Sequence, residues 1–227
     1  MTVRDAIDSI YEVFGLPGNA AAPTIMKRRI FNDLNSAMQL LWAKGNRLFD
    51  FYTRRIQTVT VASGTDSIEL SDDVQSVLGP VKIASNNVLL RPIRTRGEYD
   101  AFYSIYANSL TALANAAPQA YYVEANRSAS GPDATTITLF VVPKPTTNTN
   151  LVMEVTLKAP SFTETDYNAS PSTSIPIPHN YAETLLLPIA RYVACSSLFF
   201  ADKSKQREPQ LKAEYDRALQ SLAEAST

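Results

Sequence analysis

Residues that could act as acids, bases or nucleophiles are scarce in this chain. Its 227 residues include one histidine, His179, and one cysteine, Cys195. Both are expected on one C-terminal helix, sixteen positions and therefore about 24 Å apart, at about 1.5 Å per residue. They cannot form a Cys–His dyad within the chain, and a single cysteine excludes an intrachain disulfide. We interpret Cys195, which lies in an apolar stretch, as a small core residue.

One acidic segment has partial metal-site spacing. Glu164, Asp166 and Asn168 alternate as the first oxygen ligands of a calcium loop do. Ala169 and Ile175 stand where such a loop needs glycine and a bidentate glutamate. The segment is therefore not expected to bind calcium.

A second acidic group follows a predicted strand. Ser71, Asp72 and Asp73 are interpreted as turn residues, although a wall hydrolase that uses Glu69, Asp72 or Asp73 remains a minor alternative. The sequence contains no glycine-rich phosphate loop and no nucleophile-elbow motif. We predict that the chain is not an enzyme and that it binds no cofactor and no metal.

The composition is that of an ordinary globular protein. Hydrophobic residues make up 45% and charged residues 19%, with a formal net charge of -1. A dedicated duplex-binding protein would usually be basic, so neither sequence-specific DNA binding nor attraction to an anionic membrane is expected. The apolar run 181–200 is too short to cross a bilayer and contains Arg191. The first residues are charged and periodic, which does not predict a secretory signal.

Helical periodicity marks both ends of the chain. Apolar residues recur at helical spacing in four segments, with Thr2 as a cap for the first of them. Pro188 is expected to kink the third helix. The predicted helices cover 2–14, 23–44, 181–200 and 204–225.

The middle of the chain changes to strand-like patterns rich in β-branched residues. Asn86 and Asn87 predict a tight turn, and Thr95 with Glu98 predicts a capping box for one inserted helix over 98–106. The remaining polar segment, 160–178, is expected to run extended. The predicted strands are 55–61, 68–70, 77–84, 88–93, 120–124, 136–142 and 151–159.

These elements predict an α+β fold. A helical bundle is expected from both chain ends, 1–52 and 176–227. A central antiparallel β domain with one short inserted helix is expected over 53–160, and an extended return linker over 161–175.

Two groups of residues are candidates for interfaces. Leu211, Tyr215, Leu219 and Leu222 form one face of the last helix and should dock on the bundle or on a partner. Arg94 and Arg96 are expected to share a strand face and to pair with acidic groups of a neighbouring subunit. A third basic group, Lys27–Arg29 with Arg54–Arg55, is interpreted as a solvated helix face.

In the order of its elements, the chain resembles the tailed-phage head-to-tail adaptors, or connector proteins. The resemblance covers most of the length; Ser71 stands where the family commonly has proline, and Pro188 interrupts a helix that is usually regular. The similar stretches are Trp42–Gly45 with Phe49–Phe51, Gly64–Leu70, Pro118–Tyr122, Ile137–Pro145, Val152–Leu157 and Ile177–Tyr181.

The resemblance implies a structural virion protein at the neck, made in the host cytoplasm. Such adaptors form a homo-oligomeric ring, expected to have 12 copies, beneath the portal protein. The ring extends the channel through which double-stranded DNA passes without sequence-specific binding, and it presents a surface to a tail or nozzle protein. No membrane partner is implied.

One alternative comes from another functional class. Tyr99, Tyr103, Tyr121 and Tyr122 could form the surface of a monomeric β-type binding module that recognises a glycan or a peptide. Scattered tyrosines are usually core or rim residues, and glycan-array binding by the isolated protein would favour this alternative.

Overall fold

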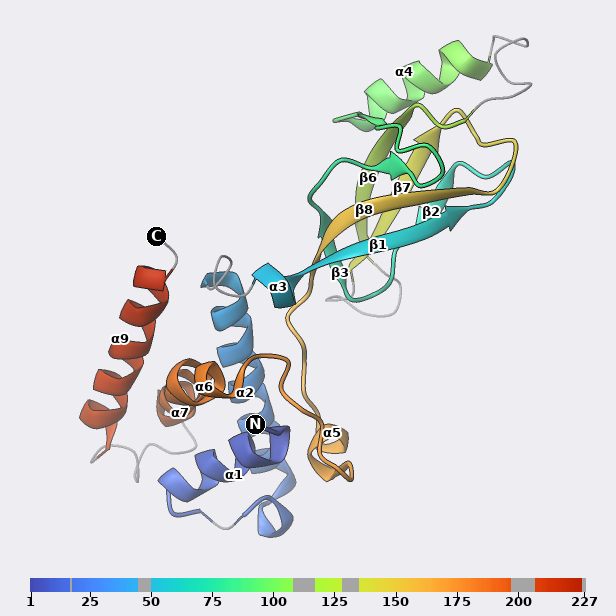
Figure 1. Cartoon of the computed structure of the whole chain (residues 1–227). Helices are drawn as coiled ribbons and strands as arrows, with labels where there is room; N and C mark the ends of the chain where they lie inside the picture. Colours follow the sequence, from blue (N-terminus) through green and yellow to red (C-terminus); the bar gives the residue numbers. More distant parts are fainter. Residues whose placement is uncertain (17, 45–49, 108–116, 128–134, 197–206, 226–227) are drawn as a thin grey trace. The chain divides into compact units, whose positions relative to one another are not determined.

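The chain folds into two compact units (Figure 1). The computed structural model describes residues 1–16, 18–44, 50–107, 117–127, 135–196 and 207–225. The helical unit comprises Met1–Thr53 and Ala159–Thr227, and the β unit comprises Arg54–Lys158. Helices together with mainly antiparallel sheets confirm the predicted α+β class.

The helical unit begins with a capped helix. The Asp5 amide donates to the Thr2 hydroxyl at 3.2 Å, and the Thr2 amide donates to the Asp5 carboxylate at 2.8 Å, so the predicted start at Thr2 is confirmed. The elements of the unit are α1 (Val3–Val13), the 3-10 helix η1 (Asn19–Ala21), α2 (Thr24–Lys44), α3 (Asp50–Thr53), α5 (Glu164–Asn168), α6 (His179–Tyr181), the π-helix η2 (Ala182–Leu186), α7 (Leu187–Ser196) and α9 (Glu208–Ala225).

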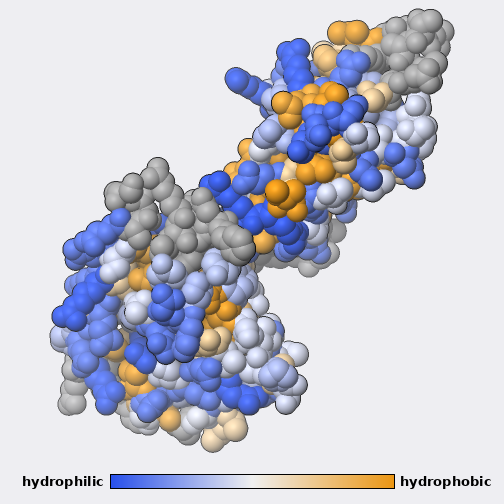
Figure 2. All heavy atoms as spheres, viewed as in Figure 1, coloured by the Kyte–Doolittle hydropathy of each residue, from blue (hydrophilic) through white to orange (hydrophobic). Residues whose placement is uncertain are grey.

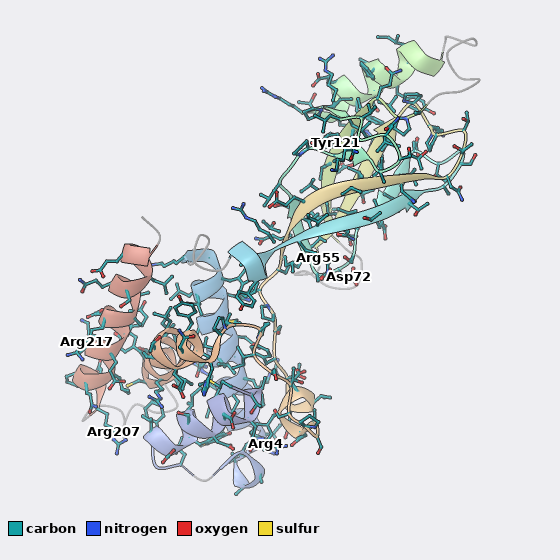
Figure 3. All side chains as sticks on the ribbon, viewed as in Figure 1. Arg4, Arg55, Asp72, Tyr121, Arg207 and Arg217 are labelled. Carbon is teal, nitrogen blue, oxygen red and sulfur yellow. The ribbon has the colours of Figure 1, made fainter. Side chains whose placement is uncertain are left out.

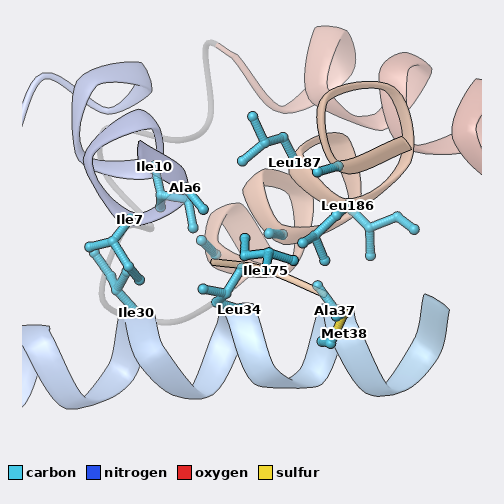
Figure 4. Packing of buried hydrophobic residues seen from close by; sticks show 14 of the residues in the cluster. Ala6, Ile7, Ile10, Ile30, Leu34, Ala37, Met38, Ile175, Leu186 and Leu187 are labelled. Atoms are coloured by element: carbon cyan, nitrogen blue, oxygen red, sulfur yellow. The ribbon is translucent and has the colours of Figure 1, made fainter. Parts of the chain in front are cut away.

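The core of the helical unit lies between α1, α2 and the η2–α7 segment (Figure 4). Ile7 and Ile10 of α1 meet Ile30 and Leu34 of α2, and all four are fully buried. Leu186 of η2 is fully buried in the same cluster. The residues that give these helices their periodicity are thus the ones that hold them together.

The irregularity expected at Pro188 is present as a π-helical turn. Residues 182–186 are wound as η2, and α7 begins immediately afterwards at Leu187. Proline has no amide hydrogen and its ring crowds the preceding turn, so a widened turn on its N-terminal side relieves that crowding. Phe199 and Phe200, which were predicted to end this helix, lie outside the described residues.

Segment 161–175 differs from the extended linker that its polar composition predicted. It contains the helical turn α5, whose N-cap Thr163 forms a capping box with Asp166. Asn35 of α2 holds the backbone of Phe162 through two hydrogen bonds, of 3.0 and 2.7 Å. Phe162 and Ile175 lie in the helical core. Two apolar anchors and one asparagine thus help to fix a segment that is otherwise polar, together with backbone hydrogen bonds from Val3 to Thr173 and from Ile175 to Met1.

The β unit consists of two four-stranded sheets. One has the order β1-β8-β3, with β4 also paired to β8, and the other has the order β2-β7-β6-β5. All pairs are antiparallel except β5–β6, which is parallel and departs from the purely antiparallel expectation. The strands are β1 (Arg54–Val61), β2 (Ser67–Glu69), β3 (Val74–Val77), β4 (Lys82–Ile83), β5 (Arg91–Pro92), β6 (Ala120–Arg127), β7 (Thr135–Val142) and β8 (Thr149–Leu157).

The core of the β unit follows the alternation of its strands. Leu151, Met153 and Val155 of β8 are buried, and the intervening Val152 and Glu154 are partly exposed, as the alternating sequence predicted. Val59 and Val61 of β1 join the same cluster. This alternation of buried and exposed positions determines which side chains of each strand face outward.

The turn and the inserted helix of the β unit were also predicted. Asn87 has a φ of 57°, in the left-handed region that asparagine tolerates, and its amide donates to the Ile83 carbonyl at 2.9 Å. The flanking strands are shorter than expected, since β4 and β5 contain two residues each. Helix α4 (Arg96–Ala107) begins after Thr95, whose hydroxyl accepts from the Glu98 amide at 3.2 Å.

Candidate interaction surfaces

The side chains that were considered for catalysis or metal binding have structural neighbours in the fold. Cys195 is buried in the helical core, and His179 is exposed, with its Nε2 3.5 Å from a Glu183 carboxylate oxygen. Glu164, Asp166 and Asn168 belong to α5, where Asp166 takes part in the cap. In the described ranges, no group of three or more His, Cys, Asp or Glu side chains is placed to hold a metal ion.

The acidic turn after β2 binds β1. Arg55 donates to the two carboxylate oxygens of Asp73 at 2.8 and 3.1 Å, and to the Ser71 hydroxyl at 3.0 Å. Figure 3 labels Arg55 and Asp72, which belongs to the same turn. The hydrogen bond from Ser71 and the Arg55 guanidinium lower the pKa of Asp73. A carboxylate held in its charged form by a bidentate arginine stabilises this corner of the sheet.

The apolar face of α9 lies against the chain's own bundle. Leu211 and Leu222 are buried in the helical core, and Tyr215 and Leu219 pack against it while remaining partly exposed. The Tyr215 ring lies 4.6 Å from that of Tyr192 on α7. Of the two possibilities for this face, docking on the bundle is the one that the structure contains.

Arg94 and Arg96 do not share a strand face. Arg94 lies in the loop after β5, and Arg96 is the first residue of α4. The Arg96 guanidinium lies over the rings of Phe140 and Tyr99, at 4.8 and 5.3 Å, and also pairs with Asp100 at 3.2 Å. Arg94 is exposed, and within the described residues its guanidinium forms no ion pair. The two arginines therefore differ in their availability to a partner.

The four tyrosines of the alternative interpretation do not form one surface. Tyr121 and Tyr122 are consecutive in β6 and point to opposite faces of the sheet, so that Tyr121 packs on the main β core and Tyr122 on the cluster beneath α4. Tyr99 is buried, and its hydroxyl donates to the Val141 carbonyl at 3.3 Å. This arrangement is that of core aromatics and does not provide a binding platform.

An exposed apolar surface lies on the outer face of the β1-β8-β4 sheet (Figure 2). We call it the Ile56 face. Ile56, Leu78 and Leu89 are 75%, 46% and 62% exposed, and the partly buried Val152 lies on the strand between them. The register Thr58↔Val152↔Lys82↔Leu89 places these positions on one side of the sheet. The alternation of side chains along β1 was the sequence signal for this face, because Ile56 occupies an even-numbered position whereas the core residues Val59 and Val61 occupy odd-numbered ones.

Comparison with known families identifies the chain. The family model described as SU10 adaptor protein matches residues 1–227, which is the whole sequence. The chain belongs to the SU10 adaptor protein family. It is therefore a phage adaptor-type protein with a structural role. A search of curated protein sequences gave no significant match.

This SU10 adaptor family member also has a buried carboxylate that the sequence did not reveal. Asp33 of α2 is 7% exposed, and its Oδ2 forms no hydrogen bond with any described residue. Burial raises the pKa of Asp33 to about 6, partly opposed by the Arg29 guanidinium. Asp33 lies close to the core residues Ile30 and Leu34 on α2. Whether a residue at this position is exposed or buried depends on how much of the helix surface is packed against other elements, which the local sequence does not show.

Arg94 and Arg96 of this SU10 adaptor family member are expected to respond differently to truncation. Arg96→Ala should lower the free energy of unfolding of the β unit by about 1 kcal/mol, because it removes two ring contacts and solvent-screened ion pairs. Arg94→Ala should change it by less than about 0.5 kcal/mol. Urea unfolding of both variants measures the difference, and equal losses would contradict it.

No helix in the described ranges of this SU10 adaptor family member combines the length and apolar character that a membrane span requires.

Proposed function

We propose that the chain is a head-to-tail adaptor of a tailed phage. It assembles as a ring beneath the portal protein, extends the DNA channel and presents a surface to a tail or nozzle protein. The match of the SU10 adaptor family over the whole chain is the observation that carries this proposal. The proposal also includes a ring of 12 copies that lies at the virion neck and is built from subunits made in the host cytoplasm.

The two units provide what a ring subunit needs. A closed ring uses two different patches on each subunit, and this chain has one helical and one β unit, each with its own core. A formal net charge of -1 supports passage of DNA without retention, because each phosphate contact would add affinity. In this proposal the helical unit contacts the portal, and the β unit, with Arg94, contacts the neighbouring subunit and the tail.

The portal contact is assigned to the solvent face of α9. Leu211 and Leu222 fix the helix on its bundle, which leaves Lys212, Asp216 and Arg217 exposed. Figure 3 shows Arg217 extending from α9 away from the bundle. Tyr215 and Leu219, which are partly exposed, border this face and can add apolar contact.

Sedimentation with the portal ring from the same phage tests the function. We expect the chain to move with the portal, and negative-stain images of the fast fraction to show a second ring beneath it. A chain that stays slow and unbound in the presence of the portal would overturn the proposal.

A charge-reversed α9 tests the assigned face. The double variant Lys212→Glu with Arg217→Glu should weaken co-sedimentation with the portal at least about tenfold, since reversing two charges within an interface destroys its electrostatic complementarity. Arg28→Glu, on the exposed side of α2, is the matched control and should bind normally. Unchanged binding of the double variant would remove α9 from the interface. Surface changes are preferable to deletion of α9, which would expose the helical core.

A further inference from the structure

Strand β1 has a long unpaired edge. It is eight residues long, and β8 is its only partner in the described sheets. In β8, the Glu154 and Asn150 carbonyls accept from Leu78 and Ala84, so these even-numbered residues turn their backbone groups toward β3 and β4. The odd-numbered residues of β8 therefore bond β1.

The register then shows which backbone groups of β1 face outward. Met153 and Leu151 of β8 lie opposite Gln57 and Val59. The odd-numbered residues of β1 therefore form the backbone hydrogen bonds to β8. Ile56, Thr58 and Thr60 turn their amides and carbonyls to the free edge, and no described residue bonds those groups. The edge is thus a row of unused donors and acceptors.

The edges of the short strands β2, β3 and β5 are blunted, and this one is not. β5 has two residues and ends in Pro92, which has no amide to donate. β2 has three residues, and β3 carries a register shift between Val74 and Ser76. Between Ile56 and Val61, β1 contains neither proline nor a charged residue. An edge left open in this way is a template for another strand.

We infer that β1 pairs with β1 of a second copy of this chain. An added strand must be long and must itself have an unpaired edge, and β1 meets both conditions. Charge selects the antiparallel orientation, because Arg54 and Arg55 at the start of each strand then lie at opposite ends of the pair.

The antiparallel pair has a defined register. With Thr58 opposite Thr58 of the second copy, Ile56 lies opposite Thr60, which pairs β-branched side chains across the junction. The exposed side chain of Ile56 is then covered on one flank, and the two Ile56 faces join across one continuous sheet. Such a twofold pair closes on itself and cannot generate a ring, so it describes the free protein and does not rest on the proposed function.

Sedimentation velocity of the full chain over roughly a hundredfold concentration range should show a monomer–dimer equilibrium with a micromolar Kd. Thr58→Pro removes an amide that β8 does not use and should abolish the dimer, whereas Thr58→Val should retain it. Ile56→Lys should weaken dimerisation at least about tenfold. Ile105→Lys, at a residue on α4 that is 68% exposed, is the matched control and should not.

Cysteine cross-linking tests the register directly. Cα atoms of a hydrogen-bonded antiparallel pair are about 5.5 Å apart, within the range that a disulfide spans. Mild oxidation of Thr58→Cys should therefore give a covalent dimer, and Val88→Cys, on the neighbouring turn, should not. A protein that stays monomeric throughout, or a dimer unaffected by both Thr58→Pro and Ile56→Lys, would overturn the inference. Thermal melts monitored by circular dichroism show whether each variant is folded.

Discussion

Leu186→Ala is expected to destabilise the helical unit by about 2–5 kcal/mol, the range for large-to-small changes in a packed core. Leu186 is fully buried, with a relative exposure of 0%, and it lies in the π-helical turn that packs against α2 in the helical core. Truncation removes its apolar contacts and leaves a space that Pro188 makes difficult to close, because the proline ring crowds the backbone of the preceding turn, in which Leu186 lies.

Urea unfolding followed by far-UV circular dichroism measures this loss. Ile25→Ala is the matched control, since Ile25 lies on α2 of the same unit but is 72% exposed. That substitution should change the free energy of unfolding by less than about 0.5 kcal/mol. A loss below about 1 kcal/mol for Leu186→Ala would mean that the η2 turn is not part of the cooperative core.

The sequence predicted the elements better than their ends. Val3, Ile7 and Ile10 specify α1, and the alternation of Leu151, Met153 and Val155 specifies β8, because in both cases one face of a regular element is buried. Segment 161–175 could not be predicted, since its structure depends on Asn35, which lies far away in the chain. Composition reports what a segment can bury by itself and does not report what a distant side chain will bind.

The candidate interface residues show the same limit. The spacing of Leu211, Tyr215, Leu219 and Leu222 correctly defines an apolar helix face, but spacing is identical whether that face meets its own bundle or a partner. Arg96 was expected on a strand because its neighbours are extended, whereas the Thr95 cap places it in α4. The free edge of β1 needs the β8 register, which no local pattern of β1 contains.

Asp33→Asn is expected to stabilise the chain at neutral pH. The pKa of Asp33 is raised from 3.8 to about 6, so the folded state binds the proton more tightly than the unfolded state. Burial of this carboxyl group costs least free energy when the group is protonated. The free energy of unfolding should therefore fall as the pH rises from about 4 to about 6 and then level off. A shift of this size corresponds to roughly 3 kcal/mol at neutral pH.

Urea unfolding of both proteins between acidic and neutral pH measures the effect. Asparagine keeps the shape of Asp33 but carries no charge, so Asp33→Asn should be more stable than the natural chain by roughly 1–3 kcal/mol at neutral pH, with the difference vanishing as the pH falls to about 4. An equal difference at every pH would show that packing, and not ionisation, is responsible.

Asp5→Asn provides a control of opposite sign. Hydrogen bonds from the Thr2 amide and hydroxyl lower the pKa of Asp5, so this carboxylate contributes stability above its ordinary pKa and loses it as the pH falls. Its asparagine variant should therefore be less stable than the natural chain at neutral pH and should approach it in acid. Opposite pH dependences for two Asp-to-Asn changes in one helical unit would separate a capping carboxylate from a buried one, a distinction that depends on their surroundings because the residue type is the same.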